Sequence, residues 1–325
     1  MRKITTYLTG MAVAVAMLSP AISNSADNYP DRPIRLVVPF APGGGNDVFA
    51  RLVAQKLSED LPQQVVVENK PGAGGNIGSK YVASSKADGY TLLLGHTGTM
   101  SINPTLYANL GYDPRDELTP VASIASTSLV LVVKQDSRFK NLTDLLEAAK
   151  ADAGKLNYAS SGAGTGNHLA AVLMDQKAGV QTTHIPYRGT GPALADLLGG
   201  QVDFTFSVIP PVLGMLKANQ LRALALTGEK RSTLLPEVPT MAEAGLSDVV
   251  SVLNYGILAP KGTPESVISY LHEKIGSVLK DPEVAERFNN EGADVVVSSN
   301  DDYKKVLEAD REKWAKVLKE ADITL

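Results

Sequence analysis

Residues 34–57 read IRLVVPFAPGGGNDVFARLVAQKL and predict a strand, a glycine-rich loop and a helix in immediate succession. The apolar run at 34–38 is typical of a buried strand, and apolar residues recur at helical spacing from 46 to 61. Further strands are expected at 64–69, 90–95, 128–134, 156–160, 183–187, 202–207, 221–227 and 254–260, and further helices at 79–86, 141–150, 191–200 and within 266–280, 281–289 and 301–318. Strands alternating with helices indicate an α/β fold with a parallel sheet. The pattern restarts after Pro120, which predicts two α/β units in series with a break near 120–128.

Three consecutive glycines precede the first helix, in the segment PFAPGGGND (39–47). A helix N-terminus leaves its first N–H groups unpaired and carries a partial positive charge, and glycines let an anion approach those groups closely. A phosphate or dinucleotide loop is not supported, because both the GK[ST] ending and the G-x-G-x-x-G spacing are missing. The segment therefore predicts either an anion cradle or a tight turn in which Asp47 serves as a cap or first-turn acid.

The second unit repeats the design in SSGAGTGNHLAAVL (160–173), where Gly162, Gly164 and Gly166 alternate with small residues. Thr165 and Asn167 can add side-chain hydrogen bonds beside the main-chain N–H groups. In open α/β sheets, ligands bind at the carboxyl ends of the strands. Two such loops facing each other across a cleft would suit a molecule with two separated carboxylates.

Catalytic patterns are poorly represented. The chain has no cysteine, and its histidines, at 96, 168, 184 and 272, show no H-E-x-x-H or H-x-H spacing. A G-x-S-x-G nucleophile elbow is also absent from the sequence. His168 falls in the first turn of its helix, where it is either a neutral histidine bonding the loop or a functional group. His96 either lines the cleft or is a solvated loop residue.

The N-terminus has the layout of a secretory signal peptide: Arg2 and Lys3, an apolar stretch at 4–18, and small or polar residues to Ala26. We therefore expect a signal peptide at 1–26 and a periplasmic mature protein. A hydrophobic content of 44% among 325 residues is enough to build a packed core. The net charge of −4 and the lack of a Lys/Arg run argue against a nucleic-acid partner. The sequence indicates no metal site and no cofactor.

Several longer motifs stand in a familiar order. They are YPDRPIRLVVPFAPGGGND, VVVENKPGAGGNIGS, ADGYTLLLGHTGTMSINPTLY, LNYASSGAGTGNHLA, HIPYRGTGPALADLLGGQVDF, LPEVPTMAEAG and GILAPKGTP. From about Tyr29 to the C-terminus, the chain resembles the extracytoplasmic solute receptors of the tripartite tricarboxylate transporter system, the Bug family.

The resemblance implies a two-lobed Venus-flytrap fold of the periplasmic-binding-protein type, type II-like, with the ligand cleft between the lobes. It implies a discontinuous first lobe, 27–125 plus 251–325, and a second lobe, 126–250. It also implies a receptor that binds a small carboxylate, largely through main-chain amides and ordered waters, and delivers it to a membrane permease. The ligand-binding residues carried over by match are Phe40, Ala41, Gly44, Asp47, Gly95, His96, Thr97, Gly164, Thr165 and His168.

Two departures from the family pattern concern the substrate. Ser207 stands where many members have an acidic residue, which makes an amino-acid ligand less expected. Asn254 stands where many have an aromatic residue, so it either bonds the far end of a polar dicarboxylate or hydroxyacid, or faces solvent. Both are counted among the candidate ligand-binding residues.

Two other functions remain open at this point. One is a ligand sensor for a membrane signalling partner, which would use the same closing lobes. The other is an exported α/β hydrolase with His96 or His168 as base. A monomer is expected, because no heptad seam is legible.

Overall fold

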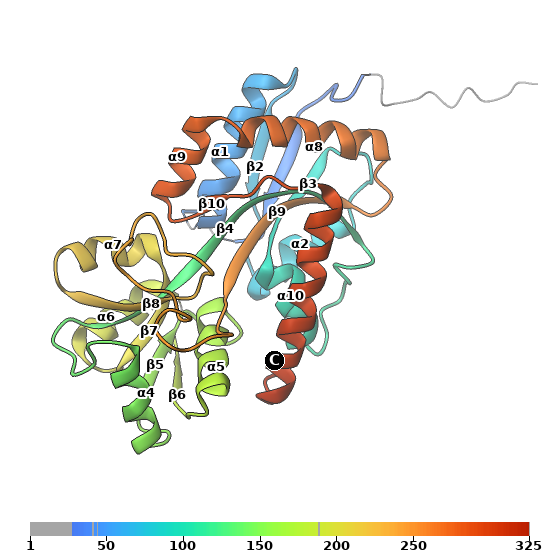
Figure 1. The fold of residues 1–325 in the computed structure, drawn as a ribbon. Coiled ribbons are helices and arrows are strands. Elements are labelled where there is room, and N and C mark those ends of the chain that lie inside the picture. Colours follow the sequence, from blue (N-terminus) through green and yellow to red (C-terminus); the bar gives the residue numbers. More distant parts are fainter. Residues whose placement is uncertain (1–27, 41, 44, 188, 325) are drawn as a thin grey trace, which may run out of the picture.

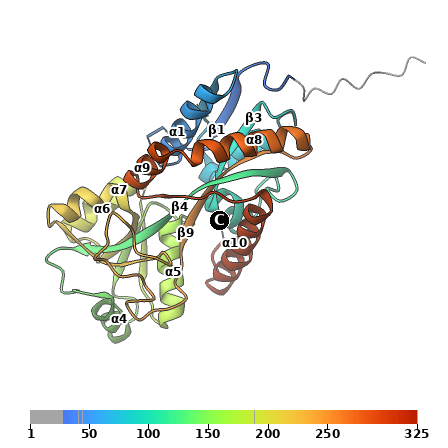
Figure 2. The same cartoon turned by 45° about the horizontal axis from the view of Figure 1, so that its top comes forward.

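A computed structural model describes residues 28–324 except 41, 44 and 188 (Figure 1). The signal peptide expected at 1–26 lies outside the described residues. The chain forms two α/β lobes, with strands running from one into the other (Figure 2). Along the continuous sheet the strand order is β2-β1-β3-β9-β4-β7-β5-β6, with β10 and β8 also paired to β4.

The first lobe is built on a parallel core sheet. Its elements are β1 (Ile34–Val38), α1 (Gly45–Asp60), β2 (Val65–Asn69), η1 (Ala73–Gly75), α2 (Asn76–Ala83), β3 (Thr91–His96), η2 (Gly98–Ile102) and α3 (Asn103–Leu106). The central strand β1 pairs with both neighbours, Leu36 lying opposite Val67 on one side and Leu92 on the other. Four of the five residues of β1 are buried and apolar, and only Arg35 is exposed, which explains why this strand reads as a mostly apolar run.

The second lobe repeats the arrangement. Its elements are α4 (Leu142–Ala151), β5 (Asn157–Ser160), α5 (Gly166–Ala178), β6 (Thr183–Pro186), α6 (Thr190–Gly199), β7 (Phe204–Val208), α7 (Ile209–Lys217) and β8 (Leu221–Leu226). β5 runs parallel to both β6 and β7, as the alternating sequence pattern predicts. Asn141 caps α4, its side chain accepting from the Asp144 amide at 2.9 Å.

Two strands connect the lobes: β4 (Leu118–Lys134) and β9 (Val252–Pro260). The first part of β4 pairs with β9 and with β10 (Asp294–Val295), whereas its second part pairs with β7 and β8. The strand expected at 128–134 is therefore only the second part of β4. Its earlier part is interrupted by register shifts after Pro120 and Ser123. That part also contains small and polar residues, so its sequence lacks the apolar pattern of a buried strand.

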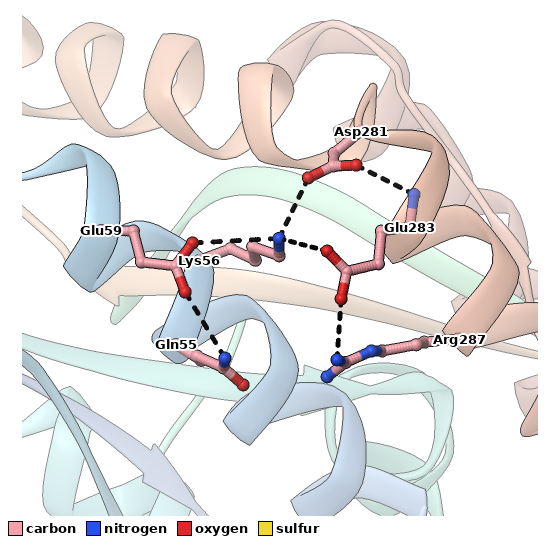
Figure 3. Close-up of polar contacts among 6 residues, drawn as sticks. All are labelled: Gln55, Lys56, Glu59, Asp281, Glu283 and Arg287. Atoms are coloured by element: carbon pink, nitrogen blue, oxygen red, sulfur yellow. Dashed lines mark hydrogen bonds and ion pairs between the residues drawn. The ribbon is translucent and has the colours of Figure 1, made fainter.

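The C-terminal region returns to the first lobe. Helices α8 (Glu265–Leu279) and α9 (Pro282–Asn290) pack beside α1, on the same hydrophobic core. Figure 3 shows Lys56 of α1 between three carboxylates, with Nζ 2.7 Å from Glu283, 3.2 Å from Asp281 and 3.8 Å from Glu59. This cluster joins segments more than 220 residues apart in the sequence.

The last helix, α10 (Asn300–Glu320), contacts both lobes. Near its start, Tyr303 packs with the first-lobe core that holds Val37. Near its end, Trp314 packs in the core that holds Leu169 of α5, and the Gln176 side chain of α5 donates to the Val317 carbonyl at 3.1 Å. The boundaries expected for the lobes, 27–125 plus 251–325 and 126–250, remain a prediction.

Candidate functional site

A cavity of about 510 Å³ lies between the lobes and is lined by residues of both. Its polar walls come mainly from the loops that precede α1 and α5. Its apolar walls are contributed by both lobes and by the connecting strands: Phe40, Phe49, Leu106, Tyr107, Leu129, Val208, Pro210, Pro211, Leu253 and Tyr255. The cavity therefore combines an apolar lining with backbone amides at helix ends.

On the first-lobe side, Phe40 and His96 form one wall. Their rings stack with centroids 4.8 Å apart, and His96 Nδ1 accepts a hydrogen bond from the Gly98 amide at 2.7 Å. Burial lowers the pKa of His96 to about 4, so the ring is neutral at physiological pH. Gly75 backs the Phe40 ring so closely that a Cβ there would lie 2.8 Å from Phe40 Cζ.

Asp47 stabilises the first loop from behind and does not line the cavity. One carboxylate oxygen accepts from the Gly43 amide at 3.0 Å and from Arg51 Nε at 2.9 Å, and the other accepts from Asn69 Nδ2 at 2.9 Å. Burial alone would raise the pKa of Asp47, but these hydrogen bonds outweigh it and lower the pKa. The structure thus favours the interpretation of Asp47 as a first-turn acid that fixes the loop.

On the second-lobe side, residues 161 and 163–167 line the cavity. The Thr165 hydroxyl donates to the Gly162 carbonyl at 2.6 Å and closes the loop on itself. Gly164 has a φ of +75°, and a Cβ there would lie 2.1 Å from Leu106 Cδ2 of the first lobe. The lobes therefore meet at this glycine, and no larger residue fits there without displacing Leu106.

His168 lies behind the second loop and is absent from the cavity wall. Its Nδ1 accepts a hydrogen bond from the Gly164 amide at 3.0 Å. Burial, reinforced by the neighbouring His184, lowers the pKa of His168 to about 4. This geometry favours the interpretation of His168 as a neutral histidine that bonds the loop, and its ligand-binding role stays a prediction.

Other predicted site residues lie away from the cavity wall. Gly95 is packed under Leu258, and Ser207 is buried with its hydroxyl donating to the Val208 carbonyl at 2.9 Å. The Asn254 side chain donates to Asp310 Oδ2 at 2.9 Å, which leaves it engaged inside the protein and gives no support to a contact with the far end of a ligand. Ala41 and Gly44 lie outside the described residues.

Thr97 is buried at the same junction as Asn254. Its hydroxyl donates to Asp310 Oδ2 at 3.1 Å and accepts from the backbone N–H of Asn254 at 2.9 Å. Asp310 of α10 thereby ties the loop after β3 to the connecting strand β9. Sequence reasoning missed Asp310 because the helix around it reads as a charged, solvated surface.

Sequence reasoning also missed several lining residues. Asn46, Asn103, Thr127, Thr190 and Glu291 add polar atoms to the cavity. Thr190 and the prolines of α7 follow strands β6 and β7, so the rule that ligands bind beyond strand carboxyl ends could have found them. No sequence signal indicates Glu291, which follows α9 and reaches the site only because the C-terminal region folds back.

The electrostatics of the cavity favour an anion. Helices α1, α5 and α6 all begin at its wall, so their N-terminal amides and positive dipole ends are directed at one space. Among the lining residues the structure describes, there is no lysine or arginine, and Glu291 is the acidic one. The described part of the chain also contains no cluster of three potential metal ligands. Within the same residues, no helix is long and apolar enough to cross a bilayer.

Comparisons with known proteins agree with this geometry. The sequence profile of the tripartite tricarboxylate transporter family receptor, TctC, matches residues 49–323. The chain belongs to the TctC family. Protein BugT of Bordetella pertussis is 37% identical over 322 residues, covering 99% of each chain. The resemblance to the Bug family is thereby confirmed.

Solved structures of similar proteins share the fold. Rpa4515 of R. palustris, solved with adipate, is 35% identical, with a TM-score of 0.83 over 91% of this chain and 99% of that one. MatC (Rpa3494) of Rhodopseudomonas palustris, solved with bound malate, is 31% identical, with a TM-score of 0.78 over 89% and 100%. The predicted two-lobed fold is confirmed. Further neighbours are the periplasmic binding protein BugD, 36% identical with a TM-score of 0.79, and a TctC solute binding protein from Polaromonas, 28% identical with a TM-score of 0.77. Because the matching profile is that of a receptor and these two neighbours are binding proteins, the chain is a solute receptor and not an enzyme, which removes the hydrolase alternative.

Proposed function

We propose that this protein is a periplasmic receptor that binds a small di- or tricarboxylate between its lobes and delivers it to the membrane permease of a tripartite tricarboxylate transporter. One observation carries the proposal: α1 and α5, from opposite lobes, both begin in glycine-rich loops on the wall of one cavity. Backbone amides at helix N-termini bind carboxylates without a cationic side chain. Among the described residues that line the cavity, there is no lysine or arginine side chain.

The two loops and the apolar wall would bind different parts of the ligand. We propose that the first-lobe loop, which contributes Gly43 and Asn46 to the cavity wall, and the loop at Ser161 to Asn167 each offer amides to one anionic group. Phe40 and Leu253 then enclose the carbon chain between them. Water molecules can bridge groups that direct contacts do not reach, at little cost in affinity. Adipate and malate, found in the relatives, set the C4 to C6 size range that we propose for this cavity.

Transport adds requirements beyond binding. The lobes must open for release, and a carboxylate that contacts both loops stabilises the closed arrangement through its differential affinity for it. We propose export by the signal peptide at 1–26 and release of cargo to the permease subunits. Ligand-binding roles for Phe40, His96, Gly164 and Thr165 belong to the same proposal, because all four line the cavity.

Thermal unfolding of the mature protein, from Asp27 onward, tests the proposal. The panel holds C4 to C6 dicarboxylates, citrate, aromatic carboxylates, amino acids, NAD and phosphate esters. A ligand at a hundred times its Kd should add about 2.7 kcal/mol of stability, a shift of a few degrees. Shifts confined to carboxylates would support the receptor, whereas shifts only with nucleotides or phosphate esters would contradict it.

Delivery to a permease is tested separately in cells. A deletion strain should lose growth on the carboxylate that the purified protein binds, and the intact gene should restore that growth. Normal growth combined with a lost transcriptional response to the same carboxylate would indicate a sensor instead.

A further inference from the structure

Two histidines that line no part of the cavity stack behind the second loop. The rings of His168 (α5) and His184 (β6) are nearly parallel, 16° apart, with centroids separated by 3.9 Å. Tyr158 of β5 stacks beside them, 5.0 Å from the His184 ring. A side-chain stack drawn from three elements is a rigid support for whatever its polar atoms hold.

Each histidine is connected to a different part of the loop. His168 Nδ1 accepts from the Gly164 amide at 3.0 Å. His184 Nε2 lies 2.6 Å from the Ser160 hydroxyl. That hydroxyl in turn bonds Gly162 twice, donating to its carbonyl at 3.0 Å and accepting from its amide at 3.1 Å. The stacked pair therefore fixes both Gly162 and Gly164.

We propose that His168 and His184 act together as positioning residues, which hold the 162–165 loop in its carboxylate-binding shape and release it when the pair is protonated at acid pH. This inference rests on the proposed function, because it assigns the loop a ligand. A protonated Nδ1 on His168 cannot accept from Gly164. Two positive rings at a separation of 3.9 Å repel each other in a buried site, so protonation disfavours the stack.

The surroundings decide the pH range. Burial lowers the pKa of both histidines to about 4, so the loop is held at neutral pH and loosens only toward pH 4. The titratable neighbours are Tyr158, from β5, and Asp175, farther along α5 and coupled to Tyr158. Burial raises the pKa of Asp175 to about 6 in spite of two hydrogen bonds from Thr182. Asp175 thus titrates in a neighbouring range without touching the loop and provides a control.

The test compares His168→Asn, His168→Phe and Asp175→Asn in the mature protein, by calorimetric titration with adipate and with malate. Asparagine keeps an acceptor near the position of Nδ1, so we expect affinity within about threefold of wild type at pH 7.5. Phenylalanine keeps a ring without an acceptor, so we expect a loss of about five- to tenfold, the scale of one hydrogen bond.

The pH profile separates positioning from plain structural support. Between pH 7 and 4, protonation of adipate or malate weakens binding equally in every variant, so the variant-to-wild-type ratio isolates the protein. The ratio for His168→Asn should rise toward pH 4, because this variant lacks one of the titrating rings. The ratio for Asp175→Asn should stay flat near pH 4–5. A flat ratio for His168→Asn would overturn the proposal, and this comparison stands even if His168→Phe fails to fold.

A measurement without ligand keeps the inference separate from the proposed function. Amide hydrogen exchange at Gly162 and Gly164 should accelerate in His168→Phe and remain slow in His168→Asn. If wild type binds neither adipate nor malate, the choice of ligand fails but this exchange pattern still decides the positioning role. Equal protection of both amides in wild type and His168→Phe would refute it.

Discussion

Replacing Gly164 by alanine should weaken carboxylate binding far more than it lowers stability. Gly164 combines a φ of +75° with a position where a Cβ would lie 2.1 Å from Leu106 Cδ2 across the cleft. Gly200 has nearly the same φ, +74°, but no atom lies within 4 Å of its Cβ position. Gly200→Ala is therefore a matched control for the backbone cost alone.

The magnitude has two parts. A left-handed conformation costs an alanine about 1–2 kcal/mol, and both variants carry that cost. Overpacking adds about 1–3 kcal/mol for Gly164→Ala, reduced to the extent that the Leu106 side chain can rotate away. Because Leu106 belongs to the opposite lobe, the second part falls on closure. We expect similar losses of unfolding free energy in both variants, and a loss of affinity of about tenfold or more only in Gly164→Ala.

Calorimetric titration and urea unfolding of the two variants provide the assay, with the carboxylate that most stabilises the wild type as ligand. A further variant, Leu106→Ala, removes the clashing atoms. The double variant Gly164→Ala/Leu106→Ala should bind nearly as well as Leu106→Ala alone, a coupling that a double-mutant cycle measures. If Gly164→Ala binds as tightly as Gly200→Ala, the lobes do not meet at this glycine in the bound state and the reasoning fails.

Four further outcomes are expected. Phe40→Ala should weaken carboxylate binding about tenfold, measured by calorimetry, because Phe40 is partly buried and its loss falls at the low end of the roughly 1.5–3 kcal/mol for a fully buried side chain; unchanged affinity would remove Phe40 from the site. Asp310→Ala should lower the free energy of unfolding in urea by about 1–3 kcal/mol, because buried donors lose their acceptor. Trp314→Ala, fully buried, should lower it by about 3–5 kcal/mol in the same assay. Finally, stability should fall as pH drops from about 6.5 to 4, because unfolded chains protonate at His96, His168 and His184 while burial lowers the pKa of all three to about 4 in the folded chain; His96→Gln should reduce this slope without abolishing it.

Local segments were predictable from the sequence. The loops within 39–47 and 160–173 can be recognised in the sequence because a strand, a glycine-rich stretch and a helix follow one another directly. Their geometry depends on neighbours only a few residues away. The cavity confirms that both loops face one space. A neutral His168 could be expected from its place in the first helical turn, where a positive charge is disfavoured, but in the structure burial and the neighbouring His184 lower its pKa.

Contacts between distant segments could not be predicted. The bond between Thr97 and Asp310 spans 213 residues, and nothing local distinguishes Asp310 from the exposed charges around it. Stacking of His168 on His184 depends on how α5 packs against β6, which no periodicity encodes. The role expected for Asn254 depended on its side-chain direction, and the structure directs it to Asp310.

Helix α10 gives the lobes a third connection besides β4 and β9. Its 21 residues extend about 30 Å, with Tyr303 seated in the first lobe and Trp314 in a core shared with α5. Opening must either separate that second contact or carry it along. Substitution of Gln176, whose side chain bonds the Val317 carbonyl, would thus shift the open–closed equilibrium without touching a ligand. Such a shift scales the Kd of every ligand by one common factor. The strength of binding and the choice of solute are therefore encoded in different parts of the chain and can change independently.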